Sequence, residues 1–159
     1  MASEFLDFLD VRQIGWQSGR PVWLTLAPLR YRSAALGTTV MIPAEFISDL
    51  ASTPRLLFTW FIAGGRAPRP SVVHDYGYQC GNLPLAEGGV IEVSRAQLDS
   101  TLHEGMLADP MSGTGPVVGG LMYGAVRAGG WWPWLRRGKR ARVLNPVWST
   151  TGWPEVQTA

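Results

Sequence analysis

The segment from Ser71 to Gln79 contains the residues of this chain that are best suited to chemistry. It reads Ser-Val-Val-His-Asp-Tyr-Gly-Tyr-Gln, and it places His74, one of two histidines, next to Asp75 and four residues before Tyr78. In a helix, residues four apart share a face, so His74 and Tyr78 project together while Asp75 points about 100° away around the axis. An imidazole beside a carboxylate that faces another partner is suited to general base catalysis with water. These residues form the first half of a candidate hydrolytic site.

Asp99 is the second half of this candidate site. Ser94 precedes apolar residues at four-residue spacing, which predicts a capped helix that presents Asp99. A carboxylate that reaches the imidazole of His74 would fix its tautomer and orientation. The alternative is that His74 is an ordinary packing residue and that Asp99 pairs only with Arg95 or His103, each four positions away on its own helix.

A further set of polar residues lies between a predicted strand and a predicted helix start. Asp49 comes after the strand-like run, and Arg55 follows Pro54. We expect Asp49 either to cap backbone amides or to act as an oxygen ligand, with Arg55 as an anion clamp. Ca²⁺ binds several oxygen ligands, and Asp49, Asp75 and backbone carbonyls near residues 64–65 could supply some of them. Zinc is less favoured, because the two histidines and the single cysteine do not have the spacing of zinc ligands.

The elements that must position these residues indicate an α+β fold. Two β-prone runs flank Ser18-Gly19, which is a hairpin signal, and a second strand pair is expected within 29–42, broken near Gly37. Helical patterns follow, so the prediction is a small N-terminal β-layer of hairpins and then three to four helices. The helices are expected to start at Thr53, at Ser71 as a cap, at Ser94 and at about Pro116.

The chain of 159 residues fits a single domain, and its 46% apolar content argues against global disorder. We assign residues 1–130 to one α+β domain and residues 131–159 to an extended arm rich in Trp and Arg. The apolar stretch 113–134 contains glycines at close-packing spacing, and we interpret it as a buried helix rather than a membrane span.

Charge is distributed unevenly, although the formal net charge is only +2. No acidic residue occurs between Asp109 and Glu155. The basic residues of that stretch are Arg127, Arg136, Arg137, Lys139, Arg140 and Arg142. Such a block favours a polyanion, an acidic protein groove or an anionic membrane surface, and the alternative is a solvated tail. Nucleic acid is the less favoured partner, because the chain has no recognisable nucleic-acid-binding motif.

Cys80 is the only cysteine, so no internal disulfide is possible and folding in a reducing cytoplasm is favoured. The first residues include Glu4 and Asp7, where a signal peptide would carry positive charge, so we do not expect secretion by that route.

Four motifs in order resemble domain-of-unknown-function family 1353 over about residues 35 to 130. They are Pro43 to Arg55, His74-Asp75-Tyr76-Gly77-Tyr78, Arg95 to Met106, and Met122-Tyr123-Gly124-Ala125-Val126-Arg127. The resemblance implies a phage or prophage origin and supplies no established activity. It implies a virion component of the tail or neck region, made in the host bacterial cytoplasm and part of an oligomeric assembly with other virion proteins.

The pattern His74-Asp75-x-x-Tyr78 followed by Asp99 also resembles the phospholipase A2 motif, especially that of the disulfide-free viral type. This resemblance implies that His74 is the base, that Asp75 is a Ca²⁺ ligand, and that Tyr78 and Asp99 hold the histidine. Two functions are therefore expected. One is a hydrolase acting on an acyl ester such as a phospholipid, and the other is a structural virion component whose arms bind neighbouring subunits.

Overall fold

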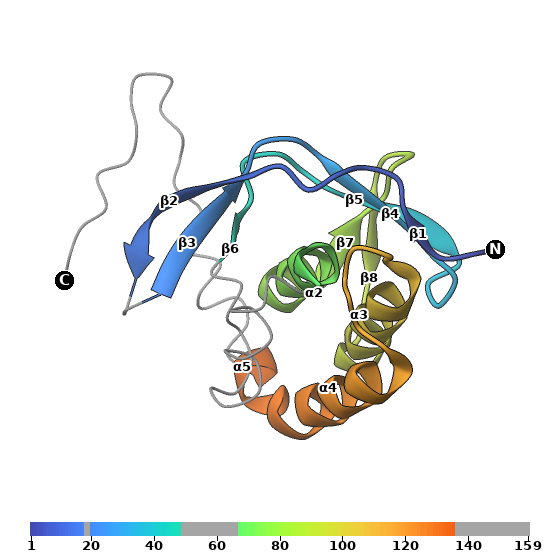
Figure 1. Ribbon diagram of the computed structural model, residues 1–159. Helices are drawn as coiled ribbons and strands as arrows, with labels where there is room; N and C mark the ends of the chain where they lie inside the picture. Colours follow the sequence, from blue (N-terminus) through green and yellow to red (C-terminus); the bar gives the residue numbers. More distant parts are fainter. Residues whose placement is uncertain (18–19, 49–66, 136–159) are drawn as a thin grey trace, which may run out of the picture.

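Short antiparallel strands lie over a group of helices in the computed structural model of this protein (Figure 1). The structure describes residues 1–17, 20–48 and 67–135. Strands come first in the chain and the long helices follow, so the predicted α+β class is confirmed. Within the described ranges, no helix is both long and apolar enough to cross a membrane.

The β-layer consists of two three-stranded antiparallel sheets, with the orders β1-β4-β5 and β2-β3-β6. Their strands are β1 (Glu4–Phe5), β2 (Val11–Gln17), β3 (Arg20–Thr25), β4 (Leu29–Ser33), β5 (Thr38–Ile42) and β6 (Ile47–Ser48). Both predicted strand pairs are present, because Gln17 lies opposite Arg20 and Ser33 lies opposite Thr38. Leu29, Tyr31 and Ser33 are buried at alternate positions of β4, as expected for a sheet with one face on the core.

The helices follow with one small hairpin among them. They are α2 (Pro68–Cys80), α3 (Arg95–Ala108), α4 (Pro116–Gly129) and α5 (Trp131–Leu135), and the hairpin of β7 (Asn82–Pro84) and β8 (Val90–Glu92) separates α2 from α3. Ser94 caps α3 in a capping box with Gln97, as predicted. The helix expected from Thr53 lies outside the described residues.

The predicted start of α2 is wrong. The helix begins at Pro68, and the Ser71 hydroxyl, inside the first turn, donates to the Ala67 carbonyl at 3.0 Å. Proline suits a first helical position because its φ is already helical and its missing N–H would have no helical partner there. The helix therefore starts three residues earlier than Ser71.

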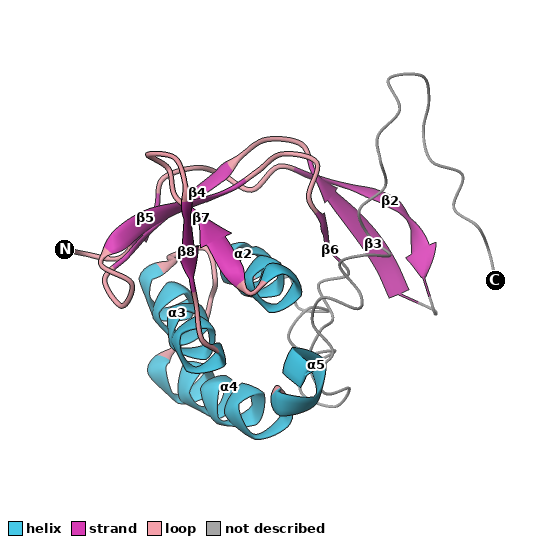
Figure 2. Ribbon diagram, turned by 180° about the vertical axis from the view of Figure 1, so that it is seen from behind, coloured by secondary structure: helices cyan, strands magenta, loops and turns pink. Residues whose placement is uncertain are grey.

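Helix α2 lies beneath the β-layer, and α3 packs against both α2 and α4 (Figure 2). Every residue from Arg69 to Asp75 is buried, including the polar ones. Buried polar groups require partners, so the polar side chains of α2 fix its position against the neighbouring elements. Arg69, for example, donates from Nε to Asp109 Oδ2 at 3.0 Å.

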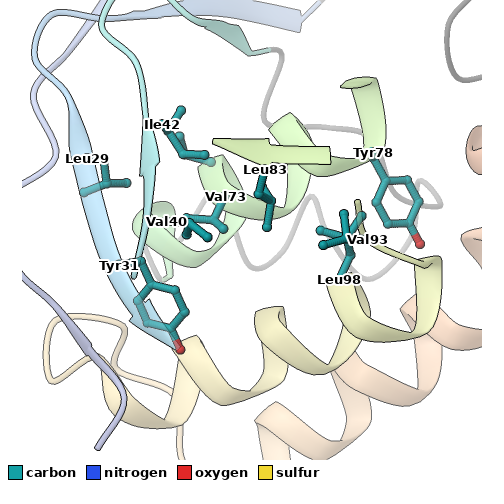
Figure 3. Close-up of a cluster of buried hydrophobic side chains, with 10 residues drawn as sticks. Leu29, Tyr31, Val40, Ile42, Val73, Tyr78, Leu83, Val93 and Leu98 are labelled. Carbon is teal, nitrogen blue, oxygen red and sulfur yellow. The ribbon is translucent and has the colours of Figure 1, made fainter. Parts of the chain in front are cut away.

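The hydrophobic core lies between the sheet of β4 and β5, helices α2 and α3, and the β7–β8 hairpin (Figure 3). Its labelled members are Leu29, Tyr31, Val40, Ile42, Val73, Tyr78, Leu83, Val93 and Leu98. Helices α2 and α3 approach closely at Gly77, where a Cβ atom would lie 2.2 Å from Leu98 Cδ2. A second apolar cluster, with Leu102, Met106, Met122 and Val126, joins α3 to α4.

The segment expected as an extended arm begins as helix α5, so the expectation of extended structure is wrong for Trp131–Leu135. The ring of Trp134 packs edge-on against Tyr78, with centroids 5.4 Å apart, and it joins the main core. This aromatic contact holds the short helix on the domain. Residues 136–159 lie outside the described part of the chain.

Candidate functional site

His74 and Tyr78 meet Asp99 across the packed pair α2 and α3. His74 Nε2 lies 3.1 Å from Asp99 Oδ1, and the Tyr78 hydroxyl donates to the same oxygen at 2.7 Å. The two rings lie on one face of α2 with centroids 4.2 Å apart. The four-residue spacing that places both side chains on one face, and the capped helix that carries Asp99, together produce this contact.

Two arginines approach the second oxygen of Asp99. Arg127 of α4 donates from Nη1 to Asp99 Oδ2 at 3.0 Å, and Arg95 Nη1 lies 3.8 Å from that oxygen. Arg95 Nη1 also donates to the Arg127 carbonyl at 2.9 Å. The expected helical pair of Arg95 with Asp99 is therefore a long contact inside a larger network. The sequence reasoning did not assign Arg127 to the site, although Arg127 is a single charge in an apolar stretch and ends the fourth motif of the family resemblance.

These contacts determine the protonation states of the site. Burial lowers the pKa of His74, and its hydrogen bond with Asp99 opposes this effect only in part. Burial acts to raise the pKa of Asp99, but the hydrogen bonds from His74, Tyr78 and Arg127 keep it below the usual value. Burial and the ionised Asp99 raise the pKa of the Tyr78 phenol. At neutral pH the site therefore holds a neutral imidazole, an ionised carboxylate and a neutral phenol.

Asp75 faces a different partner from its neighbour His74. Its Oδ2 accepts a 2.6 Å hydrogen bond from the Ser48 hydroxyl of β6, and both side chains are buried. This agrees with the expected divergence of adjacent helical positions. Asp75 thus links α2 to the β-layer, while His74 links α2 to α3.

Of the residues predicted to bind Ca²⁺, the described part of the chain contains Asp75. Ca²⁺ takes six to eight oxygen ligands, whereas the structure brings the Asp75 carboxylate together with the Ser48 hydroxyl. Among the described residues, no group of three His, Cys, Asp or Glu side chains is placed to hold a metal ion. Asp49, Arg55 and the carbonyls at residues 64–65 lie outside the described residues. Calcium binding at Asp75 stays a prediction.

The surroundings of Tyr78 include a glycine that the sequence reasoning missed. A Cβ atom on Gly130, at the end of α4, would lie 2.4 Å from the Tyr78 hydroxyl oxygen. The absence of a side chain at Gly130 thus lets α4 end against the phenol. The second histidine, His103, instead lies against Tyr123, with ring centroids 5.2 Å apart, and belongs to no part of the Asp99 network.

Comparison with known proteins finds no match among curated proteins and none among solved structures. A family model described as "Protein of unknown function (DUF1353)" matches residues 23–126, about two thirds of the chain. This range contains His74, Asp75, Tyr78, Arg95 and Asp99. The chain belongs to the DUF1353 family.

Proposed function

We propose that this protein is a hydrolase of acyl esters in which His74 activates water, and that phospholipid is its substrate class. The observation that carries the proposal is the shared contact of His74 Nε2 and the Tyr78 hydroxyl with Asp99 Oδ1, at 3.1 and 2.7 Å. The setting that we propose is a phage or prophage particle, on the basis of the family resemblance.

The proposed reaction uses the imidazole as base and then as acid. Because Asp99 is ionised, Nε2 carries the proton that faces it, and Nδ1 keeps a lone pair. Nδ1 takes a proton from water as the water oxygen attacks the ester carbonyl. The resulting imidazolium returns that proton to the alcohol oxygen as the acyl–oxygen bond breaks, which yields a carboxylic acid and an alcohol.

Each neighbour has a role in this scheme. Asp99 stabilises the transient imidazolium, while Tyr78 and Arg127 hold the carboxylate in place. The low pKa of His74 keeps the imidazole unprotonated at neutral pH, as a general base requires. No step depends on a cation at Asp75.

The experiment is a fatty-acid release assay on mixed phospholipid vesicles with His74→Gln, Asp99→Asn and the control His103→Gln. Removing the base lowers the rate by about 10²–10⁴-fold. The control keeps the rate, because His103 lies against Tyr123 and outside the Asp99 network. Release by the wild type that persists in His74→Gln would refute the proposal, and so would a wild type that releases no fatty acid.

The second candidate function is a structural virion component. It is favoured by the way in which the Asp99 network joins three helices, α2, α3 and α4, through the buried side chains of His74, Tyr78 and Asp99 and the partly buried Arg127. If the protein is structural, the loss of His74 lowers the free energy of unfolding by about 1–3 kcal/mol, because Asp99 loses a buried partner. The wild type then releases no fatty acid in the assay. Equilibrium denaturation of His74→Ala, beside the same assay, separates the two functions.

A further inference from the structure

Helix α4 exposes to solvent a face that carries no polar side chain. Its exposed residues are Pro116, Val117, Gly120, Leu121, Gly124 and Ala128. Val117 and Leu121 are 76% and 68% exposed. A surface helix of a globular domain normally presents charged or polar residues to water, so this face differs from an ordinary solvated one. We call these six residues the outer face of α4.

The outer face is not needed to pack the domain. The opposite side of α4 already contributes Met122 and Val126 to the cluster with Leu102 and Met106 of α3. Gly120 and Gly124 have no atom within 4 Å of where a Cβ would stand, so the outer face is open along its middle. Exposed apolar residues that play no part in the fold point to a partner with an apolar surface.

Charge identifies the class of that partner. The exposed Leu135 ends α5, and the next seven positions of the sequence contain Arg136, Arg137, Lys139, Arg140 and Arg142. With Arg127, the stretch between Asp109 and Glu155 carries six basic residues and no acidic one. A second copy of this chain carries the same excess of basic residues and therefore offers no complementary charge. An anionic bilayer offers negative headgroups beside apolar acyl chains and complements both features.

The length of α4 indicates how it would meet the bilayer. Its 14 residues extend about 21 Å, whereas the hydrocarbon core of a bilayer is about 30 Å thick. The helix is therefore suited to lying along the membrane surface with Val117 and Leu121 inserted at the headgroup level.

We propose that the outer face of α4 is a docking surface for an anionic lipid bilayer. Docking does not depend on the proposed hydrolysis, because neither Val117 nor Leu121 belongs to the Asp99 network. Arg127 is the link between the two, since it lies on α4 and contacts Asp99.

The test is co-sedimentation of the full chain with vesicles of phosphatidylglycerol and phosphatidylcholine, and with vesicles of phosphatidylcholine alone. The test variant is Val117→Gln with Leu121→Gln, which keeps the charge and the helical propensity. The control is Phe8→Gln with Val90→Gln, because these residues are 79% and 59% exposed and lie outside α4. Thermal unfolding verifies that both variants fold.

We expect binding to the anionic vesicles, about tenfold or more weaker in the α4 variant and unchanged in the control. Equal binding of the α4 variant would assign the attraction to the basic residues alone and overturn the proposal. A wild-type dimer in solution that the α4 variant converts to a monomer, without vesicle binding, would assign the face to a second copy. A complete lack of vesicle binding by every form of the protein would also overturn the docking proposal.

His74→Gln is measured in the same way. If this variant still binds the vesicles, docking is independent of hydrolysis, and the docking proposal stands even where the hydrolase proposal fails.

Discussion

At the scale of single residues, Asp99 organises the candidate site because its two oxygens have different partners. Oδ1 accepts from His74 and Tyr78 of α2, while Oδ2 faces Arg127 and Arg95. The side chain is fully buried, so its charge requires these donors. A side chain without an acceptor oxygen at this position would leave a phenol, an imidazole and a guanidinium without their acceptor.

The low pKa of His74 predicts that stability falls as the solution becomes acidic. Below about pH 6.5, the usual pKa of histidine, the unfolded chain binds a proton that the buried imidazole does not. The free energy of unfolding therefore decreases as the pH falls below about 6.5, by at most about 1.4 kcal/mol per pH unit. Above about pH 6.5 both states hold a neutral His74, so this loss of stability is absent.

Urea denaturation at a series of pH values between about 7 and 5 measures this slope. His74→Gln removes the titrating group, so its slope is smaller than that of the wild type. His103→Gln keeps the slope, because His74 remains in that variant. Parallel curves for the wild type and His74→Gln would contradict the prediction.

Asp75 makes the calcium prediction testable. Calorimetric titration of the wild type with Ca²⁺ is expected to give binding in the micromolar to millimolar range, a range that calcium sites of proteins cover. Asp75→Asn loses it, because an amide oxygen lacks the carboxylate charge. Ser48→Ala is the companion variant, because it removes the hydroxyl that donates to Asp75 and leaves the Asp75 carboxylate in place. Wild-type protein that gives no heat with Ca²⁺ would assign Asp75 to holding α2 against the β-layer.

At the scale of elements, the distance between α2 and α3 is determined by glycine at position 77. A Cβ there would overlap two methyl groups of Leu98, at 2.2 and 2.8 Å, and Leu98 is fully buried. Gly77→Ala is expected to lower the free energy of unfolding by about 1–3 kcal/mol, as overpacked cores do. It also moves Asp99 away from His74, because Leu98 and Asp99 are adjacent on α3.

Gly124→Ala is the matched control for this prediction. It also lies within a helix, but no atom lies within 4 Å of the Cβ position. Alanine there is expected to stabilise the protein by about 0.5–1 kcal/mol through helix propensity. Denaturant unfolding of both variants gives the comparison, and equal destabilisation of the two would show that helix packing at Gly77 is not the cause.

Some features of the helices and of the candidate site could be predicted from the sequence, and others could not. The start of α3 was predictable, because Ser94 and Gln97 form a local capping motif. The meeting of His74 and Tyr78 with Asp99 followed from helical spacing and from the resemblance to a known motif. Arg127 and Ser48 were not predictable, because they reach the site through the packing of α4 and β6, 28 residues from Asp99 and 27 from Asp75. Local patterns carry no information about such distant contacts.

At the scale of the whole molecule, the small net charge hides a strong asymmetry. Acidic residues are confined to positions up to 109 and to Glu155, whereas five basic residues fall within 136–142. Electrostatic attraction depends on local charge density as well as on the total. A molecule with a net charge of +2 is therefore expected to bind polyanions as a more basic protein would.

Retention on a heparin column tests this asymmetry. Changing Arg136, Arg137, Lys139, Arg140 and Arg142 to Gln takes the formal net charge from +2 to −3 and removes the dense positive segment, so the variant is expected in the flow-through. The control changes five basic residues outside the segment, Arg12, Arg20, Arg30, Arg32 and Arg66, to Gln and reaches the same net charge. It is expected to stay on the column until salt screens the attraction. If the two variants elute together, total charge governs binding and the basic segment has no special role.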